Sequence, residues 1–128
     1  MEDLTPLTGE VQLQVMSAVW RVGSGTVEEV RSALPPRYRG AYNTIQTVLN
    51  RLAERGLLSR HKVSNALVYR PRLSEAEYLA RSISQTLAAA SMDARQAALA
   101  RLIGDLDEAE LSDLRQLGRE MSEKRRRR

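Results

Sequence analysis

The chain has 128 residues, a length that suits one ordinary domain or a small domain with an appendage. Of these residues 42% are hydrophobic, 28% charged and 4% aromatic, and the formal net charge is +4. The absence of cysteine excludes disulfides, thiolate metal sites and cysteine nucleophiles, and a single histidine argues against a histidine-based metal site or catalytic triad. No apolar run approaches the roughly 18 residues of a membrane span and the N-terminus is acidic, so we expect a cytoplasmic protein without a cofactor.

The first predicted element is a helix within "TGEVQLQVMSAVWRVG". Leu13, Met16, Val19 and Trp20 recur there at helical spacing, and the pattern stops at a glycine. We assign Trp20, like Tyr69 further along the chain, to the core rather than to a functional site.

Three capping-box patterns mark the starts of later helices. The first side chain of a box accepts from the backbone N–H three residues on, and the acid reaches back to the cap's own N–H, so that each cap contributes about 1 kcal/mol. The pairs are Thr26 with Glu29, Ser74 with Glu77 and, as an Asp variant, Asp107 with Glu110. The first box begins a helix over "VEEVRSAL", which ends at Pro35-Pro36.

A third helix is predicted over residues 41–55, within "AYNTIQTVLNRLAERGLL", and its two sides differ in chemistry. At about 100° per residue, one side is an apolar stripe that can dock on the two earlier helices. The members of this stripe are Ile45, Val48, Leu49 and Leu52. The opposite side is uncharged and polar, with an arginine at its flank: Asn43, Gln46, Thr47, Asn50 and Arg51.

Amide and hydroxyl side chains on a helix face are suited to reading DNA bases. Asn and Gln pair bidentately with adenine in the major groove, Thr offers a hydroxyl and a methyl, and each good pair contributes roughly 1–3 kcal/mol of discrimination. We therefore predict base contacts for Asn43, Gln46 and Thr47. Asn50 lies a turn further on, and we expect it to meet only water. The alternative is a polar face that is merely solvated.

The segment "LLSRHKVSNALVYRPRL" predicts a two-stranded hairpin closed by Pro71. Its Val, Leu and Tyr residues favour strand, and Ser64-Asn65 suits a tight turn because Asn tolerates positive φ. Phosphate contacts would supply most of the affinity for DNA. The candidates are Arg39, Tyr42, Arg51, Arg60, His61 and Lys62. For His61, an ordinary surface position is the alternative.

Three helices followed by a hairpin are the order of a winged helix-turn-helix, and the charge distribution agrees with DNA binding. Residues 1–72 carry ten Lys and Arg against six Asp and Glu, residues 73–123 carry five against ten, and "KRRRR" ends the chain.

We predict a mainly α fold with a small β-hairpin. Its parts are a winged-helix DNA-binding domain (1–72), a helical dimerisation domain (73–123) and a basic disordered tail (124–128). The alternative role for the tail is added non-specific phosphate affinity.

The last predicted helices, at 74–90, 93–103 and 107–122, have apolar stripes too narrow and Ala-rich for an independent core. A second copy of the chain is the economical partner, and packing on the winged helix is the alternative. The expected dimerisation residues are Leu79, Ile83, Leu87, Leu99, Leu102, Leu111, Leu114 and Leu117.

Three segments together resemble the penicillinase-repressor (BlaI/MecI-type) transcriptional regulators: "LTGEVQLQVMSAVW", "AYNTIQTVLNRLAERGLLSRHKVSNALVYRP" and "LDEAELSDLRQL". The resemblance implies a homodimeric repressor whose winged helix reads an inverted-repeat operator. It implies a recognition helix at 41–55 and a wing at 57–71, with Ser64-Asn65 where the family commonly has Gly. The DNA contacts that it implies are Asn43, Thr44, Gln46, Thr47 and Arg51.

The resemblance also implies a route of induction. In the family, a membrane sensor metallopeptidase triggers cleavage of the repressor in its dimerisation segment, and the corresponding place is Arg101–Leu102. Arg101 stands where a small polar residue is expected. Copper-responsive relatives use a C-terminal cysteine cluster, so the absence of cysteine excludes copper sensing by that route.

A second reading, from a different class, is a winged-helix protein-interaction module without specific DNA binding. We expect no enzyme, because the sequence contains no metal-ligand cluster, nucleophile–base arrangement or phosphate-binding glycine loop.

Overall fold

The computed structural model describes residues 9–127, which form two compact units divided between Thr86 and Leu87. The first unit begins with three helices and a single 3-10 turn: α1 (Glu10–Val22), α2 (Val27–Ala33), η1 (Pro36–Tyr38) and α3 (Tyr42–Glu54). A hairpin of β1 (Leu58–Val63) and β2 (Ala66–Pro71) follows, and then α4 (Glu75–Ala88), within which the division lies. The second unit contains α5 (Met92–Gly104) and α6 (Glu108–Arg126).

Predicted caps begin three of these helices. At α2, Thr26 Oγ1 accepts from the Glu29 N–H at 3.2 Å, and the Thr26 N–H donates to Glu29 Oε1 at 2.9 Å. The same reciprocal pair begins α4, where Ser74 and Glu77 exchange hydrogen bonds of 3.1 and 3.0 Å. At α6 the Asp107 carboxylate accepts from the Glu110 N–H at 2.8 Å. These starts depend on local sequence alone, and the structure confirms them.

The core lies between α1, α2, α3 and the hairpin. The predicted apolar stripe of α3 is confirmed, because all four of its members are buried: Ile45, Val48, Leu49 and Leu52. On α1 the buried side differs from the expected stripe, since Leu13 is 41% exposed while Val15 and Ala18 are fully buried. Trp20 packs at the edge of this core, as predicted, and its indole N–H donates to the Leu73 carbonyl at 3.1 Å.

The hairpin closes through a two-residue turn with positive φ at both central positions. Ser64 has φ 48° and Asn65 has φ 67°, and Val63 pairs with Ala66 on either side of them. This geometry matches the type I′ turn, which twists in the same sense as the strands it joins. The turn therefore forms without the glycine that is common in the family. Both residues adopt positive φ at a cost that glycine would avoid.

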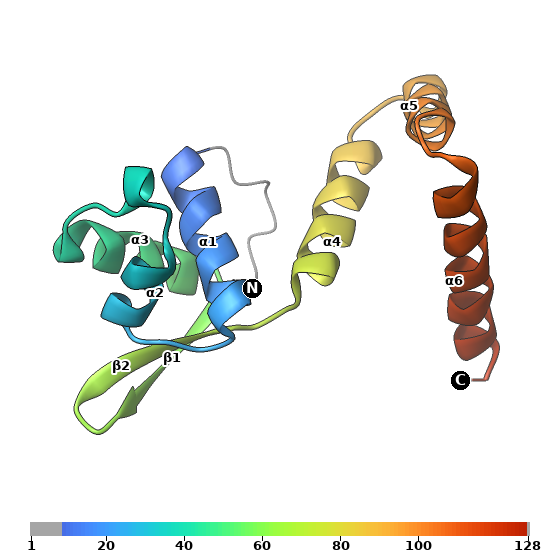
Figure 1. Ribbon diagram of the computed structural model, residues 1–128. Helices are drawn as coiled ribbons and strands as arrows, with labels where there is room; N and C mark the ends of the chain where they lie inside the picture. The colour runs from blue at the N-terminus through green and yellow to red at the C-terminus, as the bar shows by residue number, and fades with distance from the viewer. Residues whose placement is uncertain (1–8, 128) are drawn as a thin grey trace. The chain divides into compact units, whose positions relative to one another are not determined.

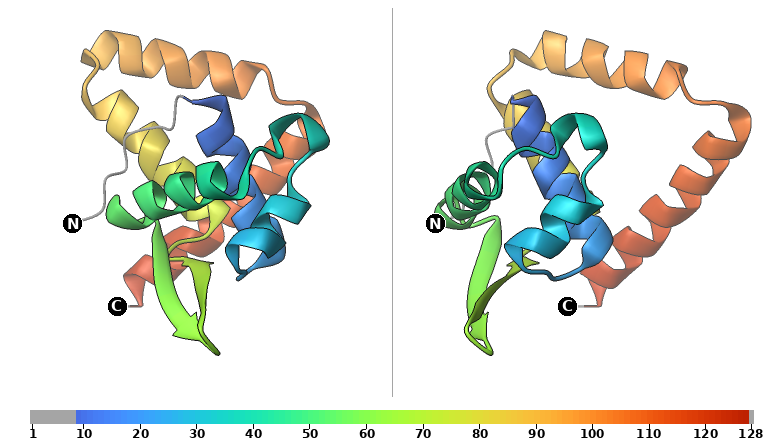
Figure 2. Two further views of the ribbon diagram at one scale, coloured as in Figure 1. Left: turned by 90° about the vertical axis from the view of Figure 1, so that its left-hand side faces the viewer. Right: turned by 60° about the vertical axis from the view of Figure 1, so that its left-hand side comes forward.

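A third segment extends the hairpin at its base. The Tyr69 N–H donates to the Gly25 carbonyl at 2.8 Å, and the Gly25 N–H donates back to Tyr69 at 3.0 Å. The hairpin projects beyond the three helices in every view (Figures 1 and 2). Three helices followed by this hairpin confirm the predicted winged helix-turn-helix.

The second unit is helical, and none of the described residues of α5 or α6 is buried. The helix α6 continues through Arg126, so Lys124, Arg125 and Arg126 are helical, and the prediction that they belong to a disordered tail was wrong. Cationic side chains in the last turn interact favourably with the negative end of the helix dipole, which explains why the helix tolerates them. Arg128, the last residue of the predicted disordered tail, lies outside the described residues.

No helix among residues 9–127 is long and apolar enough to cross a membrane.

Candidate nucleic-acid interface

The outer face of α3 presents the predicted base-reading groups to solvent. Asn43, Thr44 and Thr47 are exposed, and Gln46 is half-buried. The Thr47 hydroxyl donates to the Asn43 carbonyl at 2.9 Å. A hydroxyl has a single hydrogen, so Thr47 faces outward with acceptor lone pairs and a methyl group. That combination suits a base amino group or the methyl of thymine better than a phosphate, which only accepts.

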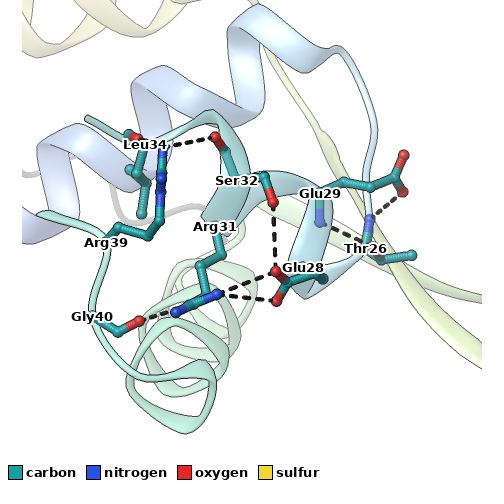
Figure 3. Close-up of polar contacts among 8 residues, drawn as sticks. All are labelled: Thr26, Glu28, Glu29, Arg31, Ser32, Leu34, Arg39 and Gly40. Atoms are coloured by element: carbon teal, nitrogen blue, oxygen red, sulfur yellow. Dashed lines mark hydrogen bonds and ion pairs between the residues drawn. The ribbon is translucent and has the colours of Figure 1, made fainter. Parts of the chain in front are cut away.

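Two arginines hold the turn that leads into α3 (Figure 3). Arg31 Nε donates to the Gly40 carbonyl at 2.7 Å, and its Nη1 pairs with the Glu28 carboxylate at 3.2 Å. Arg39 Nη2 donates to the Ser32 and Leu34 carbonyls at 3.2 and 2.9 Å. The α2–α3 turn is therefore tied to the C-terminal end of α2, which determines where the first residues of α3 lie.

Arg39 has a structural partner that the sequence did not reveal. Its bonds to two carbonyls at the end of α2 satisfy acceptors that a helix C-terminus leaves open. A guanidinium has five N–H donors, so a phosphate contact from Arg39 is compatible with this role. Tyr42, at the first position of α3, is 47% exposed. The predicted phosphate contacts of both residues stay predictions.

The register of the hairpin separates the predicted wing cations. Side chains alternate between the faces of a strand, and directly paired residues share a face. Arg60 pairs with Tyr69 and Lys62 with Leu67, so these two cations lie on the same face as the buried Tyr69. His61 pairs with Val68 and lies on the other face. The structure therefore brings Arg60 and Lys62 together and sets His61 apart from them.

Asn50 has protein partners, so the expectation that it meets only water was wrong. Its Oδ1 accepts from the Tyr69 hydroxyl at 2.7 Å and from Arg60 Nη1 at 2.9 Å. Burial raises the pKa of the Tyr69 phenol, although the nearby positive charge of Arg60 acts in the opposite direction. The phenol therefore keeps its proton at neutral pH and can act as the donor to Asn50.

A hollow lies between α3 and the tip of the wing. It is lined by polar groups from both elements, among them Tyr42 and Gln46 on α3 and Asn65 in the turn. Thr26, at the start of α2, completes the polar lining. The predicted base-reading residue Gln46 thus lies beside the wing tip rather than on an isolated helix face.

Two roles were not predicted from the sequence, namely the anchoring of the α2–α3 turn by Arg31 and the wing contacts of Asn50, and the reasons differ. Glu28 and Arg31 are three residues apart on one helix, a spacing at which opposite charges pair, so their ion pair was detectable. The bond from Asn50 to Tyr69 spans 19 residues and joins a helix to a strand. No local pattern carries such a signal.

The residues predicted to form a dimer are apolar and largely accessible. Leu79, Ile83, Leu102, Leu114 and Leu117 are between 50% and 56% exposed, and the remaining three are half-buried: Leu87, Leu99 and Leu111. The predicted cleavage residues Arg101 and Leu102 are both exposed and lie within α5. Within residues 9–127, His, Asp and Glu side chains form no group of three that could hold a metal ion.

Comparison with known proteins gives a family match over most of the chain. The family model described as penicillinase repressor matches residues 8–120. The penicillinase repressor of Bacillus licheniformis is 34% identical over 74 residues, which are 58% of this chain and 58% of that protein. The transcriptional regulator BlaI of Mycobacterium tuberculosis (strain H37Rv) is 35% identical over 117 residues, which are 90% of this chain and 84% of that one.

Solved structures show the same fold. The solution structure of the DNA-binding domain of the repressor BlaI is 33% identical, with a TM-score of 0.51, and the match covers 61% of this chain and 94% of that domain. The crystal structure of YusO from Bacillus subtilis matches with a TM-score of 0.50 over 91% of this chain and 75% of that one. At 16% identity the second likeness shows the fold alone.

Proposed function

The chain belongs to the penicillinase repressor family of transcriptional regulators, and we propose that this DNA-binding repressor acts as a homodimer on an inverted-repeat operator. The observation that carries the proposal is the outer face of α3. It presents uncharged amide and hydroxyl groups opposite a buried apolar stripe. A helix held in this way can enter the major groove while its other side stays docked on α1 and α2.

In this proposal the exposed residues of α3 make different contacts with the bases. Asn43 and Gln46 pair with base edges, Thr47 accepts from an amino group or packs on a thymine methyl, and Thr44 contacts the groove beside them. Arg31 and Arg39 hold the start of the helix, so that the base-reading side chains of α3 enter the major groove in a defined position. A helix whose start is fixed loses less freedom on binding.

Phosphate contacts supply the bulk of the affinity in this proposal. Tyr42 and Arg39 lie at the start of α3 and Arg51 on its flank. Arg60 and Lys62 share one face of the wing, on which Arg60 donates to Asn50 of α3. Cations at both ends of α3 and on the wing would meet phosphates on either side of one groove. His61 lies on the opposite face of the hairpin, and we assign it a contact with the phosphate backbone outside that groove.

The apolar side chains of α4, α5 and α6 supply the dimer interface in this proposal, with residues 1–72 for DNA binding and 73–123 for dimerisation. Their accessibility supports the assignment, because several large apolar side chains on each of these helices are exposed and a second copy would bury them. The first compact unit also includes Leu73 and Tyr78, beyond the proposed boundary. A two-fold dimer would place two α3 helices on half-sites about 10–10.5 bp, or a multiple of that, apart.

Induction and location complete the proposal. We place the protein in the cytoplasm, where its DNA is.

The resemblance implies that a sensor metallopeptidase pathway cleaves the chain at Arg101–Leu102. Both residues lie within α5, so cleavage there requires the helix to open locally. Mass spectrometry of the chain before and after induction would locate the cut, and an intact induced chain would contradict this route.

The test of the proposed function is a fluorescence-anisotropy titration of the full chain on two duplexes. One duplex carries the promoter upstream of the protein's own gene, and the other is a random sequence of equal length. We expect tighter binding to the promoter and a loss of affinity with added salt on both. Equal affinity for both duplexes would contradict sequence-specific repression. No binding at low salt would leave the protein-interaction module as the better reading.

A further inference from the structure

Asn50 lies where α3, which reads bases in the proposed function, meets the wing, which contacts the phosphate backbone of DNA. We call Asn50 and its two wing partners, Arg60 and Tyr69, the junction. Asn50 lies on the polar side of α3, in the last half of the helix, and is half-buried. Its one side-chain oxygen accepts two hydrogen bonds, from Tyr69 Oη and Arg60 Nη1, and both donors belong to the wing. A single side chain of α3 thus contacts both strands of the hairpin.

The orientation of the Asn50 amide follows from the chemistry of its partners. Arginine can only donate, so the atom that faces Arg60 must be the amide oxygen rather than the nitrogen. The same oxygen lies 2.7 Å from the phenol of Tyr69, which must then donate as well. The arrangement has one consistent pattern of donors and acceptors, and this gives the junction a defined geometry.

Tyr69 extends the junction into the rest of the fold. Its side chain is fully buried, and its backbone exchanges two hydrogen bonds with Gly25, in the segment before α2. Its partner across the hairpin is Arg60. The base of the wing is therefore held by backbone bonds on one side and by the amide of Asn50 on the other.

Arg60 gives the junction a consequence for DNA. Its guanidinium is exposed, and the bond to Asn50 restricts where its remaining N–H groups point. An arginine that is already oriented loses less side-chain freedom when it binds a phosphate. Loss of the Asn50 oxygen would release this guanidinium and the phenol of Tyr69 together.

We propose that Asn50 is a positioning residue, which holds the wing against α3 and keeps Arg60 oriented. The base contacts of α3 and the phosphate contact of Arg60 then have a fixed relative position on the DNA. The DNA part of this inference rests on the proposed function. The holding of the wing is a property of the free protein and can be measured without DNA.

The first measurement is amide hydrogen exchange of the full chain by NMR, comparing the amides of β1 and β2 with core amides of α1. In Asn50→Ala we expect the ratio of wing exchange to core exchange to rise by about tenfold, because two hydrogen bonds at the base of the wing are lost. Tyr69→Phe keeps the buried ring and should raise the ratio in the same direction. Asn50→Asp keeps an acceptor oxygen and should restore the wild-type ratio.

A matched control is Glu54→Ala, an exposed position one turn further along α3, which should leave the ratio unchanged. A merely structural role of Asn50 would speed exchange in wing and core equally. An unchanged ratio in Asn50→Ala therefore overturns the inference.

The second measurement is the salt dependence of binding to the promoter and random duplexes. In Asn50→Ala we expect affinity to fall several-fold on both duplexes, with a salt dependence shallower by about one phosphate contact and the preference for the promoter retained. Unchanged affinity and salt dependence would overturn the coupling to DNA. A wild-type chain that binds neither duplex would instead overturn the proposed function, and the exchange ratio would still decide whether Asn50 holds the wing.

Discussion

At the scale of single residues, Gln46 and Arg51 lie on one helix but offer DNA different chemistry. Gln46 carries a donor and an acceptor side by side, a pattern that only some base edges complement. Arg51 is an exposed cation on the flank of the same helix, and a phosphate presents the same charge whatever the base. The two side chains should therefore contribute to different properties of binding, namely specificity and affinity.

We predict that Gln46→Ala relaxes specificity at one position of each half-site, at a cost of about 1–3 kcal/mol on the preferred sequence. Arg51→Ala should weaken binding to all sequences about equally and reduce the salt slope by about 1. Anisotropy titrations on an operator, its single-position variants and random DNA would measure both effects. Identical losses for Gln46→Ala on operator and random DNA would show that Gln46 does not read a base.

At the scale of elements, the wing and the start of α4 show how a few residues determine whether an element forms. The two-residue turn of the wing requires positive φ at Ser64 and Asn65, which most L-residues adopt only at a cost. The start of α4 depends on the reciprocal bonds of Ser74 and Glu77. Both features are local, so each can be perturbed without touching the core.

For the wing, we predict that Asn65→Val lowers the free energy of unfolding by about 1–3 kcal/mol, because a β-branched residue is strained at φ 67°. Asn65→Gly is the matched control, since glycine adopts this backbone freely, and it should keep the wing intact. Urea denaturation would measure both variants. Equal stability of the Val and Gly variants would mean that the turn does not hold positive φ in solution.

For α4, we predict a contribution of Glu77 that depends on pH. The Ser74 backbone N–H, and next its side chain, lower the pKa of the Glu77 carboxyl. A lowered pKa in the folded state stabilises the protein fully at pH values above the ordinary pKa of Glu, and this stabilisation disappears as the pH falls through the lowered value. The difference in free energy of unfolding between wild type and Glu77→Gln should therefore be present at pH 7 and vanish in acid.

Denaturation of the wild type and Glu77→Gln across this pH range would measure that difference. Glu75→Gln, on the same turn, is the control, because its carboxylate does not take the Ser74 N–H. A difference for Glu77→Gln that persists unchanged in acid would contradict the role of the ionised carboxylate.

At the scale of the whole molecule, the proposed dimer rests on apolar surfaces that one chain leaves uncovered. Large apolar side chains remain about half-exposed on α4, α5 and α6, while the core of the first unit is buried. Burying such side chains contributes roughly 25 cal/mol per Å² of apolar surface, which a second copy can supply. Two linked DNA-binding units would then bind adjacent half-sites with a combined affinity far above that of one unit.

We predict that Leu114→Glu together with Leu117→Glu gives a monomer, because two buried charges would face the partner. Affinity for a two-half-site operator should fall about 10²- to 10⁴-fold, while affinity for a single half-site stays the same. Sedimentation and anisotropy would measure the two effects. Ser112→Glu, on the opposite side of α6, is the control and should remain dimeric. A wild-type chain that sediments as a monomer at all concentrations tested would contradict the dimer.

Residues that lie close together in the chain are sufficient to predict several features of this fold. Capping boxes, the apolar stripe of α3 and its polar outer face follow from spacing within one element, and the order of three helices and a hairpin follows from such patterns in successive segments. The side of α1 that is buried depends on the elements packed against it, because Leu13 and Val15 are both apolar and no local pattern distinguishes them. Packing also determines that Asn50 binds Tyr69 and Arg60 and that Arg31 binds the Gly40 carbonyl, since these atoms meet only when segments distant in the chain are packed together.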